Sequence, residues 1–360
     1  MGIGGFLPLD PGPPLGEGGA ESVAQRWFGG GVRPHAFRNG RSALALGACA
    51  AFAPIGTLWL PGFACHALLD AALAARDRGY LAGVATYPLN EEQAPGPDTG
   101  FLAHHLAPGD AVLVIAYFGQ PASAALYRLA EARRDVVWIE DRAQALWPGP
   151  PLGDAILYSP RKLLGVPDGG YCVVTPNGAD RAQSLPPQPP SAIPARPWPA
   201  LQRFEEEEAN ERWFPDYRRA EAGMRVEPGL PSRITGALLA RQDIGAIAAA
   251  RRANHAVLSA LIPDGFHLLP ASAPAWVPYG FPVLVPDAAA TSARMAEAGI
   301  FCPVIWPDPV EPAGCERTRS LVGRVLLLPL DQRYGPGEMR LVASAFRSAS
   351  GSGSAAPRAA

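Results

Sequence analysis

Lysine is almost absent from this chain of 360 residues. Lys162 is the one lysine among 31 basic side chains, and every other one is arginine. Arginine can replace lysine on a solvated surface, but its guanidinium stays protonated and cannot act as a primary-amine nucleophile. Arg161, directly before Lys162, shows that positive charge alone did not require lysine here. Chance retention of one lysine is the competing explanation, and a chemical role for the Lys162 amine is the alternative we pursue.

Cysteine pairs and long apolar runs are missing as well. The five cysteines are scattered and include no Cys-x-x-Cys pair, so neither a metal site nor a disulfide redox centre is expected. No stretch approaches the roughly 18 uninterrupted apolar residues of a membrane span. The first ten residues lack the charged and apolar segments of a secretion signal, which predicts a cytoplasmic protein.

Neither sign of charge is in excess. The net charge is −2 and the pI is about 6.3, so the chain has no basic field for nucleic acid and no polybasic patch for anionic lipid. Apolar residues make up 48% of the sequence and can fill a sizeable globular core. The expected partners are therefore small molecules, with no nucleic acid and no membrane.

Short apolar runs alternate with amphipathic stretches from about residue 40 to residue 175. The expected strands are Thr57–Leu60, Gly83–Tyr87, Ala111–Tyr117, Val136–Glu140, Ala155–Tyr158 and Tyr171–Thr175. Helices are expected between them at Ser42–Ala53, Cys65–Ala75 and Ala122–Arg134. Continuous apolar runs suit strands covered on both faces, and their alternation with helices predicts a mostly parallel sheet. Ligands of such sheets bind at the carboxyl ends of the strands.

The second half of the chain changes character at a proline-rich segment. Prolines crowd Pro176–Pro199, which we expect to be irregular, and the acidic run Glu205–Glu208 is typical of a solvated helix face. A helix from Ile234 to about Leu261 is expected to lead into strands at Pro282–Val285, Phe301–Trp306 and Val325–Leu328. We predict a large domain over residues 1–240, with the proline-rich crossing over 176–200, a small C-terminal domain over 241–347 and a disordered tail over 348–360.

An acid follows one of the buried strands. Asp141 comes directly after Val136–Glu140, at the end of a strand where ligands bind. In an enzyme that uses pyridoxal phosphate, a carboxylate faces the pyridine nitrogen, because the protonated ring is the electron sink for carbanion chemistry. Asp141 fits that role, and Gln144 would then bond the ring hydroxyl, unless it is an ordinary polar loop residue.

An anion site is suggested at the start of the first helix. Gly40 and Ser42 stand where free backbone N–H groups and the helix dipole favour a phosphate, and Arg41 adds positive charge. The simpler alternative is a helix cap made by Ser42 or Asn39. A nucleotide-triphosphate loop is disfavoured, because the glycines near Lys162 follow the lysine instead of preceding it.

These segments, in this order, resemble the DegT/DnrJ/StrS family of sugar aminotransferases that depend on pyridoxal 5'-phosphate. The resemblance is carried by Asn39-Gly-Arg-Ser-Ala-Leu44, Tyr117-Phe-Gly-Gln-Pro-Ala122, Glu140-Asp-Arg-Ala-Gln-Ala145, Lys162 after Gly153-Asp154, Asp168-Gly-Gly170, Ser232-Arg-Ile-Thr-Gly-Ala-Leu-Leu-Ala-Arg-Gln242 and Leu328-Pro-Leu-Asp-Gln-Arg-Tyr334. The fold it implies is α/β and of fold-type I, with a mostly parallel sheet of the seven-stranded type in the large domain and a smaller C-terminal α/β domain.

The resemblance also implies roles for individual residues. Lys162 takes the Schiff-base position, and Ser159 joins Gly40, Arg41 and Ser42 at the cofactor phosphate. Ser232 and Arg233 begin a helix that contacts the substrate or the neighbouring subunit, because the family forms homodimers with active sites at the subunit interface.

The sequence departs from the family pattern at three places. Cys65 stands where an aromatic residue usually stacks on the cofactor ring, so Phe63 or His66 is expected to substitute. Pro231 replaces an asparagine that reaches the neighbouring subunit's phosphate, and two residues are missing between Asp154 and Lys162. The chain therefore resembles a divergent branch of the family.

Three functions from two classes, enzyme and binding protein, remain in view. The first is an aminotransferase that moves an amino group, with glutamate as the expected donor, to a keto-sugar nucleotide or related carbonyl intermediate of polysaccharide or secondary-metabolite synthesis. The second is a non-catalytic binding or assembly protein of the same fold, suggested by the departures. Another reaction of the cofactor, such as sugar dehydration, is the third possibility, although the family's dehydratases have histidine at the lysine position.

Overall fold

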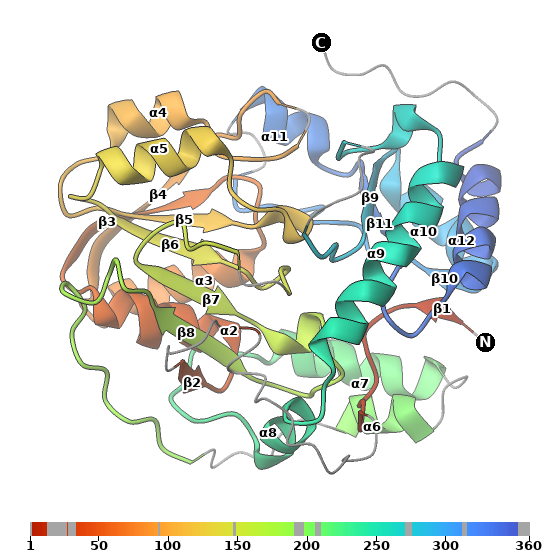
Figure 1. Ribbon diagram of the computed structural model, residues 1–360, viewed down its shortest axis with the longest axis horizontal. Coiled ribbons are helices and arrows are strands. Elements are labelled where there is room, and N and C mark those ends of the chain that lie inside the picture. Colours follow the sequence, from red (N-terminus) through yellow and green to blue (C-terminus); the bar gives the residue numbers. More distant parts are fainter. Residues whose placement is uncertain are drawn as a thin grey trace.

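The computed structural model describes residues 2–12, 27, 34–92, 94–146, 149–190, 198–205, 210–270, 276–311 and 315–351. Figure 1 shows a central sheet with helices on both faces and a second unit of helices and short strands beside it. Below them lie α6 (Trp198–Glu205), α7 (Asn210–Ala222) and α8 (Arg233–Leu239). Among the helices of these residues, none combines the length and the apolar character needed to cross a membrane.

The central sheet has seven strands in the order β2-β8-β7-β6-β5-β3-β4. They are β2 (His35–Phe37), β3 (Ile55–Pro61), β4 (Leu81–Tyr87), β5 (Ala111–Ile115), β6 (Val137–Asp141), β7 (Ala155–Tyr158) and β8 (Gly170–Val174). The five strands from β4 to β7 are parallel, whereas β8 runs antiparallel to both of its neighbours. Ile115, Asp141 and Leu157 lie in register, so the carboxyl ends of β5, β6 and β7 meet at one edge.

Helices cover the sheet on both faces, as the continuous apolar strands predict. On one face lie α2 (Gly40–Ser42), its continuation as a π-helix over Ala43–Cys49, and α3 (His66–Arg76). On the other face lie α4 (Thr99–His105) and α5 (Ala124–Ala132). Strand β5 shows why the run is apolar throughout, because Leu113 packs with the first set of helices and Val112 and Val114 with the second.

The second unit is built from the C-terminal third of the chain. Strands β9 (Phe281–Leu284) and β11 (Val325–Leu328) pair antiparallel, and the helices around them are α9 (Ile244–Leu261), α10 (Ala288–Glu297), α11 (Glu316–Leu321) and α12 (Pro336–Ala349). Strand β10 (Ile300–Phe301) pairs in parallel with β1 (Ile3–Gly4) from the other end of the sequence. Residues 3–4, which we assigned to the large domain, therefore pack on the C-terminal unit.

Below the two units lie helices that the sequence indicated only in outline. They are α6 (Trp198–Glu205), α7 (Asn210–Ala222) and α8 (Arg233–Leu239). The helix expected from Ile234 to Leu261 is interrupted, because Asp243 caps a new helix, α9, through the N–H of Ala246. The acidic residues 206–208 and the tail residues 352–360 lie outside the described part of the chain.

Two expected strands are shorter than the sequence suggested. Strand β5 ends at Ile115, because Tyr117–Gly119 forms a tight turn in which Phe118 has a φ of 57°. Strand β10 ends at Phe301, since Pro303 has no N–H to donate to a ladder. Trp306 then adopts a φ of 40°, which no strand allows.

Candidate active site

A cavity of about 380 Å³ opens at the carboxyl edge of the sheet. Its walls come from the start of α2, the start of α3, the ends of β6 and β7, and the C-terminal unit. It brings together the predicted site residues Gly40, Arg41, Cys65, Asp141, Gln144, Ser159 and Lys162. Residues more than 100 positions apart in the sequence therefore form one site, at the place where parallel sheets bind ligands.

Asp141 is the buried acid of this cavity. It is the last residue of β6 and is only 8% exposed, and its Oδ1 accepts a hydrogen bond of 2.8 Å from the N–H of Ala143. Burial raises the pKa of Asp141 above its ordinary value, while the positive charge of Lys162 opposes that rise. The charged form of Asp141 is thus favoured by any cation that enters the cavity.

The residues on either side of Asp141 face away from the cavity. Successive side chains of a strand point to opposite faces, and Glu140 and Arg142 pair with each other at 2.8 Å on the far side. Burial would lower the pKa of Arg142, but the Glu140 carboxylate holds that pKa above its ordinary value. Of three consecutive charged residues, Asp141 alone lines the main cavity.

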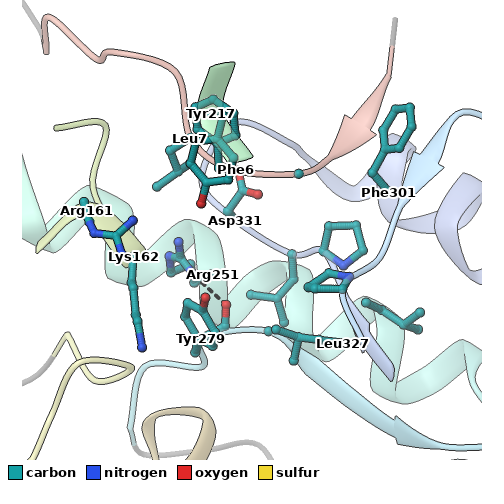
Figure 2. Close-up of a pocket in the computed structure, with 16 residues that line it drawn as sticks. Phe6, Leu7, Arg161, Lys162, Tyr217, Arg251, Tyr279, Phe301, Leu327 and Asp331 are labelled. Atoms are coloured by element: carbon teal, nitrogen blue, oxygen red, sulfur yellow. Dashed lines mark hydrogen bonds between the residues drawn. The ribbon is translucent and has the colours of Figure 1, made fainter. Parts of the chain in front are cut away.

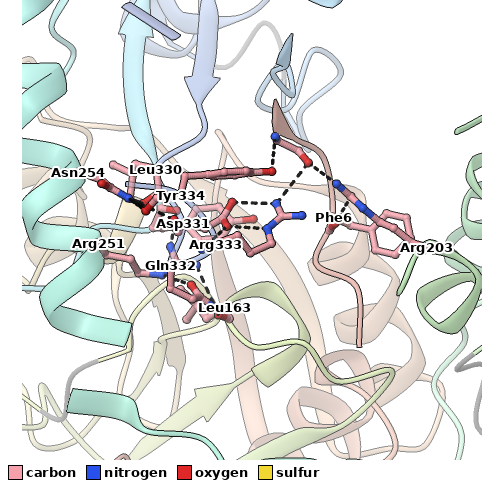
Figure 3. Close-up of polar contacts among 12 residues, drawn as sticks. Phe6, Leu163, Arg203, Arg251, Asn254, Leu330, Asp331, Gln332, Arg333 and Tyr334 are labelled. Atoms are coloured by element: carbon pink, nitrogen blue, oxygen red, sulfur yellow. Dashed lines mark hydrogen bonds and ion pairs between the residues drawn. The ribbon is translucent and has the colours of Figure 1, made fainter. Parts of the chain in front are cut away.

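Lys162 ends a short 3-10 helix, Pro160–Lys162, directly after β7. The backbone beside it is held by the C-terminal unit, because the carbonyl of Leu163 accepts hydrogen bonds from Gln332 Nε2 at 3.0 Å and from Arg251 Nη2 at 3.4 Å. Arg251 Nε in turn donates to Gln332 Oε1 at 3.0 Å (Figure 3). This network fixes the backbone from which the Lys162 amine projects.

A second, smaller cavity of about 120 Å³ adjoins the first. The two share Arg161, Lys162, Tyr279 and Pro303 as wall residues. Figure 2 shows the lysine side chain running along this cavity, with its amine pointing away from Phe6. Lys162 therefore stands between two connected spaces.

The start of α2 forms one end of the larger cavity. Asn39 caps the helix by accepting the N–H of Ser42 at 2.9 Å. The hydroxyl of Ser42 is used elsewhere, because it donates to the Glu227 carbonyl at 2.8 Å and accepts the Glu227 N–H at 3.1 Å. Ser42 is fully buried and does not line the cavity. Asn39 and Ser42 thus form a helix cap, as the simpler alternative predicted, whereas Gly40 and Arg41 lie at the cavity wall.

One glycine, Gly170, is required for this end of the cavity to form. A Cβ on Gly170 would come within 2.2 Å of the Asn39 carbonyl group, so only glycine lets β8 pass against the start of α2. A Cβ on Gly40 would lie 3.6 Å from the Cβ of Ser159. The helix start and Ser159 are thus neighbours, although 119 residues separate them in the sequence.

An unsatisfied donor at this end indicates an anionic ligand. Arg41 Nε is buried and has no hydrogen-bond partner among the described residues. A buried donor without a partner is costly, and a phosphate would satisfy it. The arrangement of one amine, one buried carboxylate and this cationic end fits pyridoxal 5'-phosphate, which would be held by Lys162, Asp141 and the group Gly40, Arg41 and Ser159.

The remaining predicted residues lie at the edge of the cavity or away from it. Gln144 lines the cavity, but its Oε1 accepts the N–H of Phe118 at 2.7 Å and so holds the turn after β5. Phe63 is fully buried behind the wall, and His66 is half exposed and lies 3.4 Å from Asp308. Cys65 is the one of the three ring-stacking candidates that lines the cavity.

Ser232 and Arg233 do not line the cavity of this chain. Ser232 caps α8, and its hydroxyl donates to Asp168 at 3.0 Å. Arg233 is exposed. Their predicted contact with substrate or with a neighbouring subunit stays a prediction.

Several wall residues were missed by the sequence analysis. Arg161 pairs with Glu221 through two hydrogen bonds of 2.6 and 2.9 Å, and both line the cavity. Tyr279 and Trp306 enter from the C-terminal unit. Apart from the position of Arg161 beside Lys162, the sequence carries no signal for them, because each depends on packing between distant segments.

In the part of the chain that the structure describes, no three His, Cys, Asp or Glu residues come together in a way that could hold a metal ion.

Solved structures share the arrangement of sheet and helices described above. The fold is that of sugar aminotransferases. DesV of S. venezuelae, solved with a ketimine intermediate, is 19% identical over 88% of this chain and 84% of its own, with a TM-score of 0.62. The sugar aminotransferase CalS13 of Micromonospora echinospora is 19% identical over 88% and 87%, with a TM-score of 0.59. The fold-type I prediction is thereby confirmed.

A third structure carries the family name that the sequence motifs suggested. A DegT DnrJ EryC1 StrS aminotransferase from Brucella abortus is 16% identical over 89% of this chain and 87% of its own, with a TM-score of 0.58. Neither a protein-family model nor a curated protein matches the sequence. At sequence identities below 20%, the similarity to these three structures establishes the fold. It supports the fold that the sequence motifs predicted.

Proposed function

We propose that this protein is an aminotransferase that depends on pyridoxal 5'-phosphate. The observation that carries the proposal is the meeting of the chain's single lysine and the buried Asp141 in one cavity whose far end holds Gly40, Arg41 and Ser159. The bound cofactor supplies an electron sink for the carbon that loses or gains a proton. A binding or assembly protein has no need for a lone amine opposite a buried carboxylate, so catalysis is favoured over that alternative.

Each residue has a defined task in this proposal. Lys162 Nζ would hold the carbonyl carbon of the cofactor, and the same amine, when free, would move a proton as a general base. Asp141 would keep the ring nitrogen protonated, since the buried carboxylate and the cationic ring would each stabilise the charge of the other. Arg41 and Ser159 would bind the phosphate, which would give Arg41 Nε the acceptor that it lacks among the described residues.

The acceptor is proposed to be a keto-sugar nucleotide or a related carbonyl intermediate of polysaccharide or secondary-metabolite synthesis, and glutamate is proposed as the donor. Support comes from the sequence motifs and from the sugar aminotransferases that share the fold. The smaller cavity offers further room beside Lys162, where it is lined by Phe6 and by Tyr279 and Leu327 of the C-terminal unit.

The absorbance spectrum of the purified protein with added pyridoxal phosphate tests the function. We expect a visible band that is absent from Lys162→Ala and that glutamate bleaches as the amino group passes to the cofactor. Tyr158→Phe serves as a control that changes a cavity side chain without touching the amine. A wild-type protein without a lysine-dependent band would contradict the proposal.

The protein is further proposed to act as a homodimer. Trp198 and Phe204 of α6 and Phe214 of α7 are 61%, 48% and 47% exposed, and large exposed apolar side chains mark interaction surfaces. The end of α7 reaches the cavity through Glu221, so a second copy on these helices would lie beside the site. Sedimentation velocity should give a dimer that Phe214→Asp shifts toward monomer, and a monomeric wild type would overturn this part of the proposal.

A further inference from the structure

The cavity has an aromatic wall that comes from the C-terminal unit. Trp306 lines the cavity together with Pro303 and Ile305, on the side where Cys65 begins α3. Cys65 presents only a small thiol there, and Phe63 behind it is fully buried. The partly exposed indole of Trp306 is therefore the large flat surface on this side of the cavity.

The backbone of Trp306 is held in an unfavourable conformation. Its φ of 40° lies in the left-handed region, which bulky side chains avoid and which persists only where the surroundings enforce it. Main-chain hydrogen bonds enforce it on both sides: Ile305 N–H donates to Val325 at 2.9 Å, and Val310 N–H donates to Ala64 at 3.0 Å. The second of these bonds ties the loop directly to the start of α3, beside Cys65.

The indole is also fixed by the residues behind it. Trp306 lies 5.1 Å from the ring of Phe63 and 5.7 Å from the ring of Tyr117, at angles of 71° and 66°. Such perpendicular packing is a favourable aromatic geometry. The hydroxyl of Tyr117 donates to the Phe63 carbonyl at 2.7 Å, so the supporting pair is itself rigid. An immobile indole at a cavity wall is suited to binding another flat ring.

We propose that Trp306 is the aromatic wall against which the cofactor ring binds, in place of a residue at the position of Cys65. The proposal rests on the proposed function. A ring whose nitrogen is kept protonated by Asp141 would gain both apolar contact and a cation–π attraction from the indole. Trp306 would thus contact the cofactor directly, and its main effect falls on cofactor affinity.

The dissociation constant of pyridoxal phosphate, measured by absorbance titration, tests this role without a turnover assay. We expect Trp306→Phe to bind within about 3-fold of wild type and Trp306→Leu to bind roughly 3- to 10-fold more weakly, because leucine keeps the apolar wall and loses the π-face. Trp306→Ala should bind more weakly still, and Cys65→Phe added to it should restore affinity by placing a ring on the same wall. Unchanged affinity in Trp306→Leu would overturn the proposal.

Tryptophan fluorescence gives a second measurement that needs only the conservative variant. Trp306 is one of 8 tryptophans, so if it touches the cofactor ring, Trp306→Phe should lose much more than one-eighth of the emission change on binding. Trp59→Phe is the matched control, since Trp59 packs on Phe101 away from the cavity. Equal losses in the two variants would overturn the proposal. A wild type that binds no cofactor would instead reject the proposed function itself.

Discussion

Lys162→Arg should abolish amino transfer although it preserves the charge and nearly the volume of the side chain. Arginine replaces lysine everywhere else in this chain, so the substitution follows the protein's own preference and is expected to fold. Because the guanidinium can neither hold the cofactor carbonyl nor release a proton near neutral pH, we expect turnover to fall by at least about 10²–10⁴-fold. Steady-state kinetics with glutamate and an acceptor, or the donor half-reaction alone, measures the loss.

The exchanged variant Arg161→Lys/Lys162→Arg is the matched control. It keeps the composition and the local charge, and it moves the amine by one position along the 3-10 helix, away from its direction beside Asp141. We expect it to be as inactive as Lys162→Arg. Activity close to that of wild type in Lys162→Arg would mean that the lysine is retained by chance.

Asp141→Asn should have opposite effects on the empty and the loaded protein. The amide keeps the oxygen that accepts the Ala143 N–H and removes a carboxylate that is costly to bury. We expect the free energy of unfolding of the cofactor-free protein to rise by about 0.5–2 kcal/mol, since relieving a strained functional site commonly stabilises a protein. Turnover should fall by roughly 10²–10³-fold, because the ring nitrogen loses its counter-charge.

The stabilisation expected from Asp141→Asn should depend on pH. Burial raises the pKa of Asp141 in the folded state above the ordinary value of 3.8, so below that value the acid is protonated whether the chain is folded or not. As the pH rises, the unfolded chain ionises first and folding becomes less favourable, until Asp141 also ionises in the folded state and the penalty is constant. Urea unfolding of the cofactor-free protein should therefore show that Asp141→Asn has a higher free energy of unfolding than wild type, by a difference that is small in acid and reaches its full size at neutral pH.

Asp135→Asn is the control, because Asp135 lies in an exposed pair with Arg133 and its replacement should give no such gain. A lower free energy of unfolding for Asp141→Asn than for wild type at neutral pH would contradict the prediction.

Local patterns predicted the central sheet well because its strands are buried on both faces. Ala155–Tyr158 of the central sheet has the bounds expected from its apolar run, and so does Val325–Leu328 in the C-terminal unit. Phe301–Trp306 has a similar composition but leaves the strand conformation, since Pro303 and the hydrogen bonds of the loop to α3 decide its path. Composition carries no information about such long-range bonds.

The candidate site likewise contains residues that local sequence predicted and residues that it did not. Lys162 and Asp141 were predicted from their residue type and from their positions after strands, and the structure brings both to one cavity. Ser42 was expected at the phosphate, but its hydroxyl is used by the backbone of Glu227, 185 residues later. Glu221 and Trp306 could not be predicted, because they reach the cavity through packing between segments that no local pattern relates.

The pairing of β1 with β10 affects the order in which the protein can fold during translation. Phe6 and Leu7 follow β1 and form part of the smaller cavity beside Lys162. Their position depends on Ile300 and Phe301, and on the hydrogen bond of 2.8 Å from Gly4 N–H to the Tyr334 hydroxyl. On the ribosome, the central sheet can form once residue 174 has emerged, whereas this wall must wait until almost the whole chain has been made. A nascent chain would therefore contain the lysine and the acid for some time before it has a finished substrate cavity.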